Sequence, residues 1–115
     1  MKKKKRPSSQ SESLRLKWKK RIIFEKGYSE PCAEWMAERL EDLLDHMRYG
    51  HAMVAYRKQD GSFRMVRATL IHYEAEFHKR HDPTTVEGAV VYWNVDEQRW
   101  TTFQVENFME WRPVV

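Results

Sequence analysis

The last 65 residues alternate between short apolar runs and turn signals, and this pattern constrains the fold more than any other feature of the chain. Two runs, 52–58 and 63–71, flank Asp60-Gly61, a dipeptide typical of tight β-hairpins. A second pair, 89–95 and 100–105, is joined by a turn at 96–99, and a helical turn at 106–108 leads to a last strand at 109–112 before Pro113. The pattern predicts about five antiparallel strands that close into a small SH3-like or Sm-like barrel.

The first hairpin also predicts which side chains share a face of the sheet. If Asp60-Gly61 is a two-residue turn, Gln59 faces Ser62 across the hairpin. Tyr56 then lies on the same face as Met65, because side chains alternate along a strand.

A helix is predicted immediately before the barrel, at about residues 30–49. Ser29 or Glu30 can cap it, Pro31 is tolerated in its first turn, and Gly50 ends it. Its apolar stripe consists of Cys32, Trp35, Met36, Leu40, Leu43, Leu44 and Met47. The opposite face is acidic and is either solvated or occupied by basic residues of the same chain. The fold class is therefore α+β, a helix packed on a small antiparallel barrel.

The N-terminal region is strongly basic. Residues 1–26 hold eleven Lys and Arg against two Glu, whereas the remainder holds 10 basic and 15 acidic residues. A basic segment on an acidic body indicates a polyanionic partner, because Lys and Arg release condensed counterions from nucleic acid. The alternative interpretation is a solvated, disordered tail. The candidate phosphate-contacting residues of this region are Lys2, Lys3, Lys4, Lys5, Arg6, Lys17, Lys19, Lys20 and Arg21.

The organisation of this basic region is less constrained. Leu14, Trp18 and Ile22 recur at a spacing of four, which predicts a helix that ends before Gly27, although residues 21–24 also suit a strand. We expect residues 1–28 to form a basic arm that is disordered or partly helical. We expect residues 29–115 to form the helix-and-barrel domain and to fold without the arm.

Other classes of protein find little support in the sequence. The apolar runs are too short to cross a bilayer, and the basic N-terminus leads into polar residues instead of the apolar core of a signal peptide. Cys32 is the only cysteine, which suits a reducing compartment, so we expect a cytoplasmic protein. No nucleophile, base and carboxylate stand at a recognisable spacing, so we expect no enzymatic activity.

The connection at 72–88 is the one segment where metal-ligating residue types cluster. His72, His78 and His81 lie among acidic residues, but their spacing matches no known metal motif. We therefore expect no metal or other cofactor, and a solvated loop in which Tyr73 and Phe77 pack back onto the barrel.

Two segments carry a family resemblance. Residues 60–70 (DGSFRMVRATL) and 100–108 (WTTFQVENF) resemble small SH3/Sm-like barrel proteins related to the WYL domain, which are short proteins of gut anaerobes, phages and mobile elements. The resemblance covers about residues 52–112. It implies a barrel of the kind that, in WYL-containing transcription regulators, binds nucleic acid or a small effector. The basic positions of the closing strand in that family fall on Thr101, Gln104 and Asn107 in this chain, so three positive charges are missing.

Two functions remain in competition. The first is a nucleic-acid-associated accessory or regulatory protein, in which Arg64 and Arg67 add phosphate contacts and Tyr56 and Trp93 stack on bases. The second is a protein-interaction module of phage or mobile-element origin, which the five tryptophans favour because Trp is enriched at interface hot spots.

Overall fold

The computed structural model describes residues 8–115, with side chains from residue 13 onward. Two long helices come first, α1 (Ser8–Lys26) and α2 (Glu30–Met47). The remaining chain contains strands β1 (His51–Arg57), β2 (Phe63–Thr69), β3 (Ala89–Asn94), β4 (Arg99–Gln104) and β5 (Phe108–Pro113), with a short helix α3 (Tyr73–Phe77) and two 3-10 turns, η1 (Pro83–Thr85) and η2 (Val105–Asn107).

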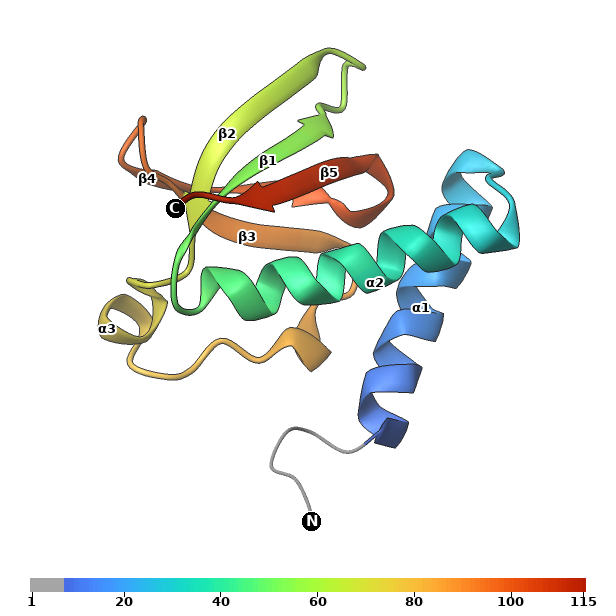
Figure 1. Cartoon of the computed structure of the whole chain (residues 1–115), viewed down its shortest axis with the longest axis horizontal. Coiled ribbons are helices and arrows are strands. Elements are labelled where there is room, and N and C mark those ends of the chain that lie inside the picture. The colour runs from blue at the N-terminus through green and yellow to red at the C-terminus, as the bar shows by residue number, and fades with distance from the viewer. Residues whose placement is uncertain (1–7) are drawn as a thin grey trace.

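The five strands form one antiparallel sheet in the order β4-β3-β2-β1-β5. The sheet curls so that the last strand returns to the first, and α2 runs along one side of it (Figure 1). Helix α1 crosses α2 near the start of α2, whereas α3 lies toward the other end of the molecule (Figure 1). The predicted α+β architecture of a helix on a five-stranded barrel is confirmed.

The first hairpin differs from its prediction by one residue. Lys58 pairs with Ser62, so the loop has three residues, and Gly61 alone adopts a positive φ, of 88°. A turn followed by a left-handed Gly is the usual three-residue hairpin. The slip exchanges the faces of β2: Tyr56 is opposite Arg64, and Met65 is turned outward opposite Ala55.

Helix α2 begins and buries its stripe largely as the sequence indicates. The Ser29 hydroxyl accepts a hydrogen bond from the Cys32 amide at 3.3 Å, which caps the helix. Cys32 and Trp35, predicted in the stripe, are exposed instead, Trp35 to 45%. The side chains that the helix buries are Ala33, Met36, Ala37, Leu40, Glu41, Leu43, Leu44 and Met47.

Helix α1 is part of the main core. Leu14, Trp18 and Ile22 have at most 2% of their surface exposed, which confirms the predicted helix and excludes the strand alternative. Trp18 also donates its indole N–H to the Val86 carbonyl at 3.0 Å. The expected domain boundary at residue 28 therefore cuts through a shared core, and the independent folding of residues 29–115 stays a prediction.

The long connection packs against the sheet through aromatic side chains. Tyr73 and Phe77 of α3 contact Trp100 on β4, with ring centroids 5.8 and 5.2 Å away. The Trp100 indole donates a hydrogen bond to Glu76, which closes the contact. The predicted return of Tyr73 and Phe77 onto the barrel is confirmed. Within residues 8–115, no three His, Cys, Asp or Glu side chains form a group that could hold a metal ion.

Candidate functional site

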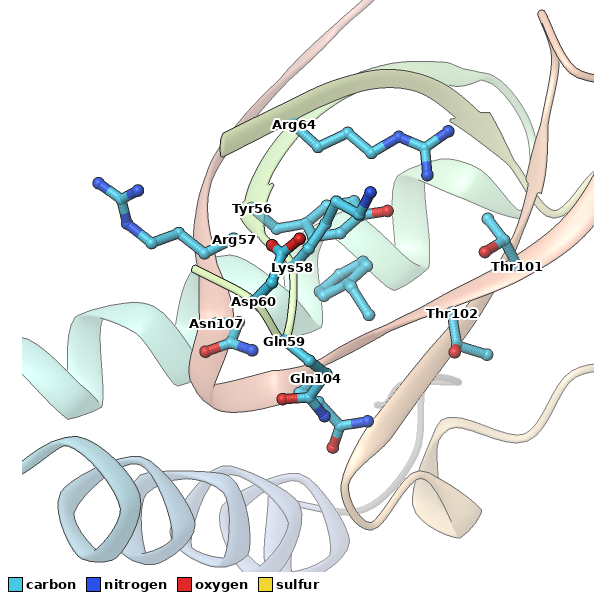
Figure 2. A pocket seen from close by; sticks show the side chains of 11 residues that line it. Tyr56, Arg57, Lys58, Gln59, Asp60, Arg64, Thr101, Thr102, Gln104 and Asn107 are labelled. Carbon is cyan, nitrogen blue, oxygen red and sulfur yellow. The ribbon is translucent and has the colours of Figure 1, made fainter. Parts of the chain in front are cut away.

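A pocket of about 400 Å³, lined mostly by polar and charged residues, opens at the end of the barrel where the β1–β2 hairpin approaches β4. Side chains from both elements surround the opening (Figure 2). The residues that line it are Tyr56, Arg57, Lys58, Gln59, Asp60, Arg64, Thr101, Thr102, Phe103, Gln104 and Asn107.

Aromatic residues form the base of this pocket. The Tyr56 ring stacks on Phe103 with centroids 4.9 Å apart, and its hydroxyl bonds the Tyr92 hydroxyl at 2.7 Å. Burial, followed by that hydrogen bond, raises the pKa of Tyr92 well above its usual value, so the phenol stays neutral. Each of these rings is at most 3% exposed, which makes the base of the pocket rigid.

Cations stand on the hairpin side of the opening. Arg64 is paired with Glu97, and Arg57 donates to the Gly61 carbonyl at 3.0 Å. Lys58 is exposed and forms no salt bridge with any described residue. Asp60 turns back to accept hydrogen bonds from Ser62, which lower its pKa and occupy one of its oxygens. Lys58 is thus the cation most available to a ligand.

Hydroxyl and amide groups of the pocket come from β4 and η2, and Gln59 adds one from the hairpin. Thr101, Gln104 and Asn107 come from β4 and η2, and all three line the same pocket (Figure 2). These are the positions at which the resembling proteins carry basic residues. The structure therefore gathers the three departures from the family pattern at one place, where Arg57, Lys58 and Arg64 supply the positive charge from another element.

Helix α1 reaches the edge of this pocket through Arg21. The Arg21 Nε donates to Glu106 at 2.7 Å, and its Nη2 donates to the Gln104 side chain at 3.1 Å. The Glu106 hydrogen bond, the main cause, raises the Arg21 pKa. The guanidinium lies against Gly88, where an added Cβ would come within 2.7 Å of it.

The basic residues of α1 divide into two groups. Lys19 lies between Glu30 and Glu34 at 3.4 Å, and the hydrogen bond with Glu34 is the main cause that raises its pKa. Arg21 and Lys19, both expected to contact phosphates, are thus engaged in internal ion pairs, whereas Lys17 and Lys20 are exposed. Basic residues of α1 therefore form ion pairs with the acidic face of α2, which confirms one of the two alternatives expected for that face.

The remaining candidate residues are dispersed. Arg67 lies on the outer face of β2, Trp93 packs edge-on against His72 and Trp100, and neither lines the pocket. Tyr56 does line it, but its buried ring leaves no free face for a base to stack on, which argues against the stacking role. Lys2, Lys3, Lys4, Lys5 and Arg6 lie outside the described residues.

Arg57, Lys58 and the polar residues of β4 are not predicted as a site by the sequence alone. A signal was present, since Arg57 and Lys58 stand together beside the Asp60-Gly61 turn. The missing information was the closure of the barrel, which brings that turn next to β4, about 40 residues away in the sequence.

The fold and its pocket define an α+β protein with an Sm-like SH3 barrel. The model of the WYL_2 family, described as an Sm-like SH3 beta-barrel fold, matches residues 40–109, and the chain belongs to this family. The WYL-related resemblance is confirmed. No curated protein and no solved structure matches significantly. None of the helices between residues 8 and 115 has the length and apolar character that crossing a membrane requires.

Proposed function

We propose that this protein is a non-enzymatic nucleic-acid-binding accessory or regulatory module, and that its pocket takes one nucleotide of a single strand. The observation that supports the proposal is the pocket itself, which combines three cations and one carboxylate, Asp60, with five Thr, Asn or Gln side chains over an aromatic base. A volume of about 400 Å³ falls within the range of small-ligand sites. A base pair inside a duplex cannot enter such a pocket, whereas an unpaired nucleotide can.

The two sides of the pocket suit the two ends of a nucleotide. Lys58 and Arg57 favour phosphate, because charge-assisted hydrogen bonds to an anion are stronger than neutral ones. Gln104 and Asn107 carry both donors and acceptors, which suit the edge of a base. We therefore assign phosphate binding to the hairpin and base contacts to β4 and η2.

Helix α1 extends this surface beyond the pocket. Lys17, Lys20 and Phe24 are spaced three and four residues apart and lie on one side of the helix. Phe24 is 85% exposed, and both lysines are exposed. Arg21 links the helix to Gln104, so a strand that leaves the pocket would meet these residues next. In this proposal Lys2 to Arg6 add long-range attraction without sequence preference.

The test is a titration of labelled single-stranded DNA, single-stranded RNA and duplex DNA at several salt concentrations. Lys58→Gln should raise the Kd for single strands by about fivefold to tenfold, or roughly 1 kcal/mol, and flatten the log-log salt slope by about 0.7 per lost phosphate contact. Replacing Lys2 to Lys5 by Gln should flatten the slope further and leave sequence preference unchanged. Lys79→Gln, in the connection after α3, is the matched control.

A gain-of-function variant makes the test stricter. Thr101→Arg restores a cation where the family pattern has one, and we expect it to strengthen binding. Ala75→Arg adds the same charge on α3, away from the pocket, and should have little effect. Equal effects of the two variants, or no binding by the parent chain to any oligonucleotide, would contradict the proposal and favour a protein-interaction module.

A further inference from the structure

The outer face of β2, β1 and β5 carries a second hollow, of about 420 Å³, which we call the methionine groove. It lies on the opposite side of the sheet from the residues that form the base of the nucleotide pocket. The residues that line it are Arg39, Met53, Ala55, Met65, Glu110, Trp111 and Arg112.

Large apolar side chains around this groove are left in contact with water. Met65 is 55% exposed, and Phe63, beyond it on the same strand, is 54% exposed. Apolar patches of this kind mark interaction sites, and methionine adapts well to a partner surface because its side chain is flexible and polarisable.

The groove is flanked by uncompensated positive charge. Arg112 and Arg67 lie on either side of Met53 in the strand ladder. Arg112 forms no salt bridge within the described part of the chain, and the buried Nε of Arg67 has no hydrogen-bond acceptor. The only carboxylate in the groove, Glu110, is already paired with Arg39 at 2.8 Å. Acidic groups on a partner would therefore complement this face.

Contacts with Arg39 block the centre of the β5 edge, so that an additional strand cannot pair with β5 there. Arg39 donates to the Trp111 carbonyl, the Trp111 indole donates back to the Arg39 carbonyl at 2.9 Å, and the guanidinium lies 4.7 Å from the Trp111 ring. An extended peptide that lies across the groove, and not along a strand edge, would leave its own backbone groups without partners, whereas a helix satisfies them internally.

We infer that the methionine groove binds an acidic amphipathic helix of a partner protein. Apolar side chains of that helix pack on Met53, Ala55 and Met65, and its flanking carboxylates pair with Arg112 and Arg67. This site is independent of the nucleotide pocket, so the chain can join a nucleic acid to a protein. The observation that favours an acidic helix as the partner is the excess of positive charge beside an apolar strip.

The test uses the full chain and a labelled sixteen-residue helical peptide with leucines on one face and glutamates on its flanks. We expect saturable binding, measured by fluorescence anisotropy, that weakens at least tenfold with Met65→Glu and about threefold to tenfold with Arg112→Gln. A peptide with Gln in place of Glu should bind more weakly, and its binding should depend less on salt.

Matched controls separate this site from general effects. Leu16→Glu introduces the same negative charge as Met65→Glu, but at an exposed apolar residue of α1. Lys58→Gln alters the nucleotide pocket. Both variants should bind the peptide as the parent chain does. Thermal melts of Met65→Glu and Arg112→Gln should remain cooperative, since both residues are exposed.

Three results would overturn the inference. The first is peptide binding that is absent in the parent chain or indifferent to Met65→Glu. The second is displacement of the peptide by an oligonucleotide whose own binding depends on Met65 and Arg112, because the groove would then be a nucleic-acid site. The third is a concentration-dependent dimer, seen by ultracentrifugation and abolished by Met65→Glu, which would make a second copy of the chain the occupant.

Discussion

Helices α1 and α2 have nearly the same length, 19 and 18 residues, but they are attached to the barrel in different ways. Helix α2 buries a broad stripe of seven apolar side chains between residues 33 and 47, together with Glu41. Among its described side chains, helix α1 buries a narrow line of three, Leu14, Trp18 and Ile22, with Ile23 partly buried beside them, and polar contacts add to this attachment. These contacts include Trp18 with the Val86 carbonyl, Arg15 with Glu41, Lys19 with Glu30 and Glu34, and Arg21 with Glu106 and Gln104.

The difference shows that a basic helix need not be a free nucleic-acid arm. Part of the positive charge of α1 neutralises carboxylates of α2 and η2 and positions the helix. On the described part of α1, Lys17, Lys20 and Lys26 are exposed and form none of these ion pairs, and the barrel adds further cations around the pocket and beside the methionine groove. The proposed nucleic-acid surface accordingly centres on the barrel mouth.

Removal of residues 1–28 is the most severe test of the comparison. Helix α2 and the five strands still pack on one another, so we expect the truncated chain to show a cooperative thermal transition, at a clearly lower Tm. The Tm falls because Leu14, Trp18 and Ile22 no longer cover the core. Loss of the cooperative transition in calorimetry would show that α1 is required for the fold and that the boundary at residue 28 is wrong.

Single core substitutions compare the two regions directly. Trp18→Ala in α1 and Phe103→Ala in β4 remove aromatic rings that are 0% and 3% exposed, and each should cost about 3–5 kcal/mol in urea denaturation. Leu16→Ala, at an exposed site on α1, should cost less than about 0.5 kcal/mol. A cost for Trp18→Ala below about 1 kcal/mol would mean that α1 is a peripheral attachment.

Gly88→Ala tests the polar attachment of α1. The new methyl group would collide with the Arg21 guanidinium, which must move away from Glu106. We expect a loss of about 1 kcal/mol, typical of a partly exposed charged hydrogen bond. In an Arg21→Ala background the same substitution should cost almost nothing, and a double-mutant cycle measures the difference. Equal costs in both backgrounds would place the strain in the backbone near Gly88.

The smallest expected effect is a pH dependence in the segment that follows α3. Burial, the main cause, and the nearby Arg48 lower the pKa of His81, against the opposite effect of Asp82. The unfolded chain then takes up this proton at a higher pH than the folded chain does. The contribution of His81 to the free energy of unfolding is therefore complete above about pH 6.5 and decreases as the pH drops below that value. Denaturation at pH 7.5 and 5.5 should show this loss in the parent chain and a smaller one in His81→Gln.

The sequence predicted the elements whose signals are local. The apolar stripe of α2, the alternating strands and the Asp60-Gly61 turn are each indicated by residues that belong to the element itself. The faces of β2 were wrong because a dipeptide that suits a two-residue turn also suits a three-residue turn with a left-handed Gly61. Because of that one-residue slip, Met65 lies on the face opposite to Tyr56 instead of beside it, and there it lines the methionine groove.

The sequence by itself determined the α+β class, the barrel and the excess of positive charge near the N-terminus, since periodicity and composition are properties of neighbouring residues. Only the tertiary structure decided how that charge is used. Arg21 meets Glu106 across 85 positions of sequence, and Lys58 meets Thr101 at one pocket through closure of the barrel. Such contacts depend on how the sheet curls and where the helices cross. A local sequence pattern cannot predict them, because the residues in contact are far apart in the chain.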